Sequence, residues 1–456
     1  MSVATAEVVI CGAGICGLAA AYHLTVTHGV KNVVLIDERP PLTLTSDKSS
    51  EAYRNWWPGP GDAMVKLMNR SLDWLERWAR ESRNRFLLNR RGYVYLTADP
   101  KRIDDFKHAA EESSGLGAGE VRYHTARSDA EPYAPITPHG FEDQPTGADL
   151  VLERALIRER FPYLNENVVA LLHPRRCGWF SGQQLGMYLL EQARAHGAHL
   201  INGKIDRVAV QSNRVQTIHF GSESIDTGCF VDAAGPYLKE VGQLLGVDLP
   251  VFNELHCKIS IKDTLGIVPR DAPLLVWADP QYLPWSPEEQ AELADSDETR
   301  WLLNQFPAGA HLRPEGGSGS DVLILLYNYH TDPVEPIWPP ELDPFYPEIA
   351  LRGLSTMIPG LSAYSGKVSR PYFDGGYYTR TRENRALVGP LPIEGAYVCG
   401  AVSGHGLMAA GAVGELLAAH VTGSPLPDYA PAFSLDRYDD PAYQKLLENW
   451  GASGQL

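Results

Sequence analysis

An apolar strand that runs directly into a glycine-rich turn restricts the fold of this chain more than any other feature. Residues 8–11 are followed by the pattern G-x-G-x-x-G at Gly12, Gly14 and Gly17, and small residues continue at helical spacing. The first glycine allows a tight bend, the second lets the backbone approach a pyrophosphate, and the third lets the helix pack on the strand. The segment therefore predicts a strand–turn–helix unit that binds a dinucleotide.

A second apolar run, residues 33–36, follows the predicted helix and ends in two acids. An acid at the end of the second strand of such a unit accepts hydrogen bonds from ribose hydroxyls. The complete strand–helix–strand context is more specific than the glycines alone. The residues predicted to bind the cofactor in this unit are Gly12, Gly14, Ile15, Cys16, Gly17, Asp37 and Glu38.

Composition and charge disfavour several classes of protein. A length of 456 residues favours two domains, and a formal net charge of −16 argues against a nucleic-acid partner. No run is long enough to predict a membrane span, and no basic leader precedes the first strand, so a cytoplasmic protein is expected. The six cysteines lack a C-x-x-C pair, so neither a disulfide framework nor a metal site is expected. The oligomeric state stays open.

The order of predicted elements indicates two interleaved domains. Helices are expected over 61–82, 101–113, 183–196 and 345–357, and a hairpin is expected from 86–88 and 93–96. An α/β pattern resumes near 168, and longer strands, including 255–262 and 322–329, follow from 251. We therefore expect a mixed α/β (α+β) fold, in which a discontinuous Rossmann-like nucleotide-binding domain is combined with a second, sheet-rich substrate domain.

Three further segments carry motifs in a characteristic order. They are CGWFS at 177–181, FVDAAGP at 230–236 and VSGHGLM at 402–408, the last preceded by LVGP at 387–390. Together with the first turn and Asp37, their order and spacing resemble the D-amino-acid oxidase superfamily of FAD-dependent oxidoreductases, on the branch of sarcosine oxidase, glycine oxidase and dimethylglycine dehydrogenase. The resemblance covers nearly the whole chain.

The resemblance implies FAD as the dinucleotide and a substrate domain whose sheet covers one face of the flavin. It implies an FAD-binding domain in residues 1–84, 151–250 and 376–456, the last part including a C-terminal tail, and a substrate domain in 85–150 and 251–375. In such proteins the turn at 403–406 lies beside the flavin ring. The further cofactor-binding candidates are Ser46, Lys48, Ser49, Val208, Ala234, Gly235, Gly400, Ser403, Gly404, His405, Gly406, Leu407 and Met408.

Two departures from the family bear on oxygen reactivity and on flavin attachment. Sarcosine oxidases have lysines where this chain has Met408 and, in our alignment, Leu326. Losing a cation beside the flavin removes stabilisation of developing superoxide, so a dehydrogenase or slow oxidase is expected. Gly375 and Gly376 stand where the family has a flavin-linking cysteine. FAD is therefore expected to bind non-covalently.

The substrate site implied by the resemblance is aromatic and contains one arginine. Arg54 matches a family arginine that engages the substrate carboxylate, although pairing with an internal acid such as Glu51 is the alternative. Tyr378 and His330 match pocket residues and are candidates to deprotonate an amine. The predicted pocket walls, each of which is alternatively a core residue, are Trp56, Trp57, Tyr327, Tyr329 and Tyr377.

These features together favour an FAD-dependent oxidase or dehydrogenase of amino acids or secondary amines. The expected reaction is hydride transfer to flavin N5, which gives an imine that hydrolyses, with oxygen or another acceptor taking the electrons. Two alternatives stay open: a 2-hydroxy-acid dehydrogenase, and a non-catalytic flavin-binding subunit of a larger complex. A pyridine-nucleotide reductase is disfavoured because the sequence has one complete dinucleotide fingerprint.

Overall fold

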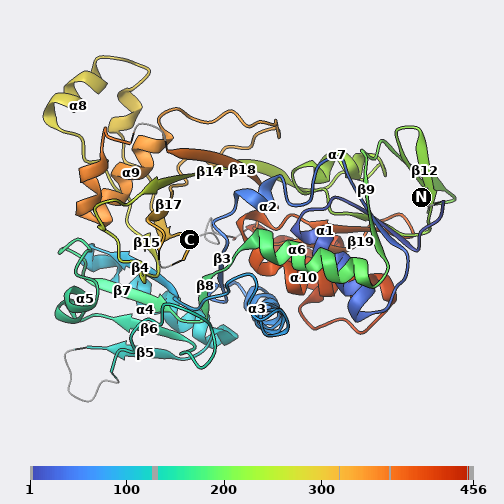
Figure 1. Ribbon diagram of the computed structural model, residues 1–456, viewed down its shortest axis with the longest axis horizontal. Coiled ribbons are helices and arrows are strands. Elements are labelled where there is room, and N and C mark those ends of the chain that lie inside the picture. Colours follow the sequence, from blue (N-terminus) through green and yellow to red (C-terminus); the bar gives the residue numbers. More distant parts are fainter. Residues whose placement is uncertain (1–3, 126–131, 318, 369–370, 449, 451–456) are drawn as a thin grey trace.

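Two large sheets lie side by side along the long axis of the molecule (Figure 1). The computed structural model describes residues 4–125, 132–317, 319–368, 371–448 and 450. The predicted mixed α/β fold, with a discontinuous nucleotide-binding part and a second sheet-rich part, is confirmed. The strands of the smaller sheet, in sheet order, are β19 (Leu387–Pro390), β20 (Ala396–Gly400), β13 (Phe230–Asp232), β1 (Val8–Cys11), β2 (Val33–Asp37) and β9 (Ala198–Asn202).

The six-stranded sheet is buried on both faces, which explains why its central strands are continuous apolar runs. Because side chains alternate along a strand, Val8 and Ile10 of β1 face one core while Val9 faces another. The helices of the first core are α1 (Ile15–Tyr22), α3 (Ala63–Glu81), α6 (Gly182–Ala195) and α10 (Gly406–Thr422). The opposite face packs on α7 (Leu238–Gln243) and on the three-stranded sheet of β10 (Arg207–Gln211), β11 (Arg214–Phe220) and β12 (Glu223–Asp226).

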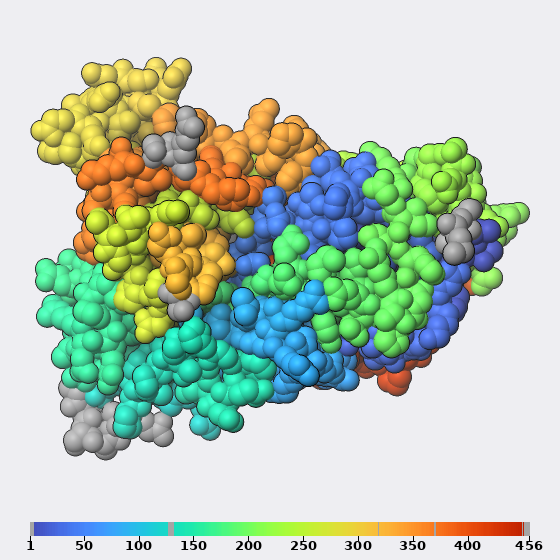
Figure 2. Space-filling view, in the orientation of Figure 1, coloured from blue at the N-terminus to red at the C-terminus, as the bar shows by residue number. Residues whose placement is uncertain are grey.

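The larger sheet has nine strands and lies on the left of Figure 1. Its strands, in sheet order, are β18 (Tyr372–Arg380), β14 (Phe252–Lys262), β17 (Val322–Leu326), β16 (Ala310–Pro314), β15 (Leu274–Trp277), β4 (Tyr93–Thr97), β7 (Ala170–Pro174), β6 (Ala148–Val151) and β5 (Val121–His124). Helix α9 (Tyr346–Met357) packs on one face, and α4 (Ile103–Ser113) contacts β6 and β7. In Figure 2 the yellow segment that contains α8 (Pro287–Ala294) projects from this half.

Most predicted elements are present, and two expectations are wrong. Helices α3, α4, α6 and α9 confirm the four predicted helices. The hairpin from 86–88 does not form, because Leu87 has a left-handed φ of 57° and β4 pairs with β7 and β15 instead. The strand predicted over 322–329 ends at Leu326, so the period-two alternation does not extend to Tyr327 and Tyr329.

The predicted domain boundaries at 150, 250 and 375 stay predictions. β7 belongs to the nine-stranded sheet, although the boundary at 150 assigns its residues to the nucleotide-binding part. β18 crosses the boundary at 375.

Replacing Gly414 with alanine is expected to destabilise the helical layer. A Cβ at Gly414 of α10 would lie 2.6 Å from the carbonyl carbon of Ala19 in α1, and backbone atoms have little freedom to retreat. Overpacking of this kind costs about 1–3 kcal/mol. A thermal melt of the variant should show a lower Tm than Gly115→Ala, where a Cβ meets no atom within 4 Å. Equal melting temperatures would contradict the prediction.

Candidate cofactor and substrate cavities

The first cavity lies where the parallel strands β1, β2, β13 and β20 end, and its space, including the part open to solvent, is about 870 Å³. Ligands of open α/β sheets bind at this edge, because the loops there leave backbone groups free. The predicted cofactor residues that line it are Gly12, Gly14, Ile15, Cys16, Asp37, Ser46, Ser49, Ala234, Gly235, Gly400, Ser403, Gly404, Gly406 and Leu407. Tyr377 and Tyr378, predicted for the substrate site, line it as well.

The glycine turn at this cavity is too crowded for larger residues at two of its three positions. Gly12 has a φ of +105°, and a Cβ there would lie 2.5 Å from the Ala233 carbonyl oxygen. A Cβ at Gly17 would lie 2.1 Å from the Gly12 carbonyl oxygen, so this glycine allows α1 to pack against the turn. At Gly14 a Cβ would meet only the Ser46 hydroxyl, at 3.5 Å. A side chain at position 14 would therefore project into the cavity and not into the protein core.

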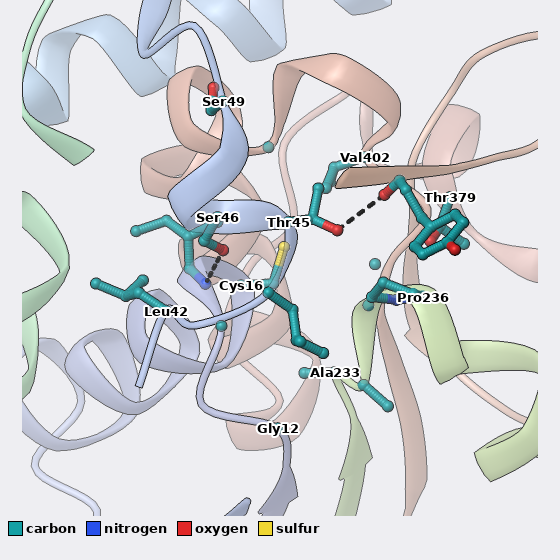
Figure 3. Close-up of a pocket in the computed structure, with 18 of the residues that line it drawn as sticks. Gly12, Cys16, Leu42, Thr45, Ser46, Ser49, Ala233, Pro236, Thr379 and Val402 are labelled. Atoms are coloured by element: carbon teal, nitrogen blue, oxygen red, sulfur yellow. Dashed lines mark hydrogen bonds between the residues drawn. The ribbon is translucent and has the colours of Figure 1, made fainter. Parts of the chain in front are cut away.

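Hydrogen bonds fix the shape of the turn and the loop beside it (Figure 3). The Ala13 N–H donates to Asp37 Oδ2 at 2.7 Å, and the Ile15 N–H donates to Ser46 Oγ at 3.1 Å. The Thr45 hydroxyl donates to the Tyr377 carbonyl at 2.9 Å, which joins the loop to β18. Helix α1 begins at Ile15 without an acid in its first turn, so its N-terminus is suited to an anion.

Six predicted cofactor residues do not line the first cavity. Gly17 lies beneath the turn, Glu38 is exposed beside Arg39, and Val208 is buried in the core between β10 and the six-stranded sheet. Lys48 forms ion pairs with Asp47 at 2.7 Å and Asp374 at 2.9 Å, and these raise its pKa although burial opposes them. The remaining two, His405 and Met408, line the neighbouring cavity.

The second cavity adjoins the first, because Tyr378 and Gly404 line both. Its space between the nine-stranded sheet and the start of α10, including the part open to solvent, is about 960 Å³. The sequence-predicted residues among its walls are Arg54, Trp57, Tyr378, Gly404, His405 and Met408. No aspartate or glutamate is among its described lining residues. A ligand in this space would contact cationic and neutral polar groups rather than carboxylates.

Arg54 is buried in this wall without a carboxylate partner. Its side chain belongs to β3 (Ala52–Arg54), which pairs with β8 (Cys177–Trp179), and only 6 % of the residue is exposed. Nη1 donates to the Tyr95 hydroxyl at 3.2 Å, and the guanidinium lies 4.4 Å from the centre of the Trp57 ring. Within the described ranges no acid lies within ion-pair distance of Arg54.

The alternative that Arg54 pairs with Glu51 is wrong. Glu51 instead accepts hydrogen bonds from Arg313 at 3.2 Å and from the Gly182 N–H at 2.8 Å. The buried guanidinium of Arg54 therefore keeps donors available for an anion from outside the chain.

A cluster on β14 and β18 was not predicted from the sequence. His256 Nε2 lies 3.0 Å from Glu254, and Arg380 pairs with the same carboxylate at 3.1 Å. The His256 ring stacks on Tyr378 with centroids 3.9 Å apart. Further along the same face, Lys258 donates to the Asp47 and Ser49 carbonyls, and burial lowers its pKa. The sequence does carry one sign of this cluster: polar residues occupy every second position of an otherwise apolar strand.

His405 lies at the start of α10, next to Trp57. Both of its ring nitrogens are buried without a hydrogen-bond partner in the described chain. Burial, aided by the charges of Arg54 and Arg380, lowers the pKa of His405 to about 3. The ring is therefore neutral at physiological pH and places no second positive charge beside the cavity.

Four other predicted pocket residues lie elsewhere. The His330 side chain is 57 % exposed and lies 3.4 Å from Asp343. Tyr327 and Tyr329 line a third cavity together with Cys257 of β14. The residue before Cys257, His256, lines the second cavity. Because adjacent residues of a strand point to opposite faces, the two cavities lie on opposite sides of the sheet. Trp56 is buried in the helical core. The structure therefore does not bring His330, Tyr327, Tyr329 or Trp56 to the second cavity.

The described residues form neither a membrane span nor a metal site. No helix in the described part of the chain is long and apolar enough to cross a membrane. Among the same residues, no group of three or more histidine, cysteine, aspartate or glutamate side chains is placed to hold a metal ion.

Comparisons with known proteins agree with this geometry. The family model for FAD-dependent oxidoreductases (DAO) matches residues 7–420. Human mitochondrial dimethylglycine dehydrogenase is 25% identical over 319 residues, which cover 67% of this chain and 33% of that protein. The chain therefore spans about a third of the length of this relative. The FAD-dependent oxidoreductase domain-containing protein 1 of Bos taurus is 22% identical over 453 residues, 90% of this chain and 80% of that protein.

Two solved structures share the fold over nearly their whole length. L-proline dehydrogenase from P. horikoshii superposes with a TM-score of 0.73 at 18% identity, covering 96% of this chain and 98% of that one. Glycine oxidase from Geobacillus kaustophilus superposes with a TM-score of 0.71 at 16% identity, covering 94% and 98%.

The residues of the first cavity fit the cofactor of this family. The helix N-terminus at Ile15 suits the pyrophosphate, and Asp37 keeps lone pairs for ribose hydroxyls beyond its bond to Ala13. Ser403 lines the cavity, and its hydroxyl is buried without a partner among the described residues. The family match over residues 7–420, together with this cavity, shows that the chain belongs to the DAO family of FAD-dependent oxidoreductases, with FAD as its cofactor.

Proposed function

We propose that this protein oxidises the C–N bond of an amino acid or secondary amine. One observation supports the proposal above the others: a buried arginine without a carboxylate partner lines a cavity that adjoins the cofactor cavity. A buried charge is costly unless it is paired, so a substrate carboxylate is a suitable partner for Arg54. Binding there would hold the substrate next to the shared wall at Tyr378 and Gly404.

Each of the other cavity residues would then have a defined task. Bound FAD supplies the acceptor at flavin N5 for the hydride on the carbon next to nitrogen, and the resulting imine hydrolyses. Tyr378, held by its stack on His256, would form the wall against which the substrate lies. Neutral His405 and the apolar parts of Trp57 and Met408 would keep water from the reacting carbon.

The relatives support an amine that carries a carboxylate. Proline, glycine and dimethylglycine, named in the three relatives, each combine an amino nitrogen with a carboxyl group. We also propose that FAD is held non-covalently, since Gly375 and Gly376 lie on β18 where the linking cysteine is expected. We keep the proposal of a dehydrogenase or slow oxidase. Met408 and Leu326 stand where sarcosine oxidases have lysines, so these two positions supply no cation to stabilise developing superoxide.

Anaerobic titration of the purified yellow holoprotein tests this function. N-methyl, cyclic and aromatic amino acids should bleach the flavin, and slow recovery of the colour in air would indicate a dehydrogenase. Bleaching by 2-hydroxy acids but not by amines would replace the proposal with the hydroxy-acid alternative. Failure of every compound, together with a tightly bound partner protein, would instead favour the non-catalytic subunit.

A further inference from the structure

A histidine on the central part of the nine-stranded sheet lines the second cavity, and a hydrogen bond fixes its tautomer. His311 lies on β16, and its Nδ1 is 2.8 Å from the Gly309 carbonyl oxygen. A carbonyl oxygen only accepts hydrogen bonds, so Nδ1 carries the proton and Nε2 carries the lone pair. In the described part of the chain Nε2 has no hydrogen-bond partner. His311 therefore offers the cavity an acceptor.

The charge of this ring is also fixed. Burial lowers the pKa of His311 to about 4, and the Arg54 guanidinium contributes to the lowering although the Gly309 carbonyl opposes it. At neutral pH the imidazole is uncharged, so Nε2 accepts and does not donate. Because the described walls of the cavity contain no carboxylate, they offer no counter-ion for an ammonium group. An amine in this space is favoured in its neutral form.

The other two histidines of the cavity are less suited to contact a ligand. Both ring nitrogens of His405 and Nδ1 of His256 are buried atoms without a partner in the described chain, whereas Nε2 of His311 is not enclosed in this way. His256 Nε2 is already engaged with Glu254. Arg54 and His311 line the same cavity, so a ligand bound there lies between a guanidinium and a hydrogen-bond acceptor.

We infer that His311 accepts a hydrogen bond from the N–H of the bound amine, and that the site thereby prefers primary and secondary amines over tertiary ones. This inference rests on the proposed function. A neutral secondary amine has one N–H for Nε2, and its nitrogen lone pair stays free to form the imine. A neutral tertiary amine has no N–H, and it would leave a buried acceptor unsatisfied. Dimethylglycine, the tertiary amine named in the human relative, would accordingly be a poor ligand.

Two N-methylated compounds test the preference without turnover when the FAD of the anaerobic holoprotein has been chemically reduced beforehand, because reduced flavin accepts no hydride from the N-methyl carbon. The holoprotein is titrated calorimetrically with 2-(methylamino)isobutyrate and with its N,N-dimethyl analogue, and each affinity is referred to the neutral form of the amine. The wild-type protein should bind the monomethyl compound about tenfold more tightly, the value of one hydrogen bond. His311→Phe should reduce the ratio to about one, and His311→Gln, which keeps an acceptor oxygen, should retain part of it.

The control is His108→Gln on α4, an exposed position that should leave the ratio unchanged. Equal binding of the two compounds by the wild type, no binding of either, or a ratio that persists in His311→Phe would overturn the inference. Flavin bleaching by oxidisable amines reports separately on the proposed function. A protein that is bleached by amines but lacks the preference would refute the role of His311 alone.

Discussion

Replacing Gly17 with alanine is expected to destabilise the cofactor-binding layer, whereas the same change at Gly14 should weaken FAD binding and leave the fold intact. At Gly17 of α1 the new methyl group would lie 2.1 Å from the carbonyl oxygen of Gly12, which belongs to the turn before the helix. The strain costs about 3 kcal/mol or more. At Gly14 the nearest atom is the Ser46 hydroxyl at 3.5 Å, an ordinary contact, so the methyl group projects where FAD is expected.

Apoprotein melting and FAD binding separate the two effects. Gly17→Ala should lower the Tm of the apoprotein by at least about 5 °C. Gly14→Ala should leave that Tm unchanged and weaken FAD binding by more than about tenfold, which is about 1.4 kcal/mol. Gly228→Ala, with no atom within 4 Å of its Cβ, serves as the control for both measurements. A stable Gly17→Ala apoprotein, or normal FAD affinity in Gly14→Ala, would contradict this assignment.

Replacing Arg54 with methionine is expected to abolish most activity on amino acids without destabilising the protein. Loss of a buried carboxylate–guanidinium contact costs about 3 kcal/mol, so kcat/KM should fall by more than about a hundredfold. Arg54 has no acid partner in the described structure, so burying its charge costs folding free energy that no ion pair offsets. Replacing Arg54 with an uncharged residue removes this cost. The Tm should therefore stay constant or rise, as is common where activity and stability conflict.

A lysine at the same position provides the matched comparison. Arg54→Lys keeps the charge but loses the planar pair of donors, so its kcat/KM should lie between those of the wild type and Arg54→Met. Propionate, which has a carboxylate but no amine, should perturb the flavin spectrum of the wild type and not that of Arg54→Met. A marked fall in Tm for Arg54→Met would show that the arginine has a structural role instead.

Much of the fold and the cofactor cavity could be predicted because the relevant residues are local in the sequence. The turn at Gly12–Gly14 and the segment at 403–406 each follow a strand and open a helix, and this context restricts both conformation and position. Val208 could not be placed in this way, since it depends on how a separate three-stranded sheet packs on the first.

The substrate cavity was less predictable because its residues come from distant antiparallel strands. His330, Tyr327 and Tyr329 were placed by extending a strand beyond Leu326, where it ends. His256 and His311 reach the cavity through the pairing of β14, β17 and β16, and neither belongs to a motif. Arg54 was predicted from the family resemblance alone, because it matches a family arginine that engages the substrate carboxylate.

The discontinuity of the cofactor cavity has a consequence for how this protein matures. Its walls come from residues 12–49, 233–236, 377–379 and 399–407, so the chain must be synthesised as far as residue 407 before the cavity is complete. A ligand stabilises only the conformation that binds it. FAD therefore cannot assist the early folding of the nucleotide-binding sheet, and the nascent chain must reach a native-like apoprotein first. In cells short of riboflavin, this apoprotein would be the species exposed to proteases.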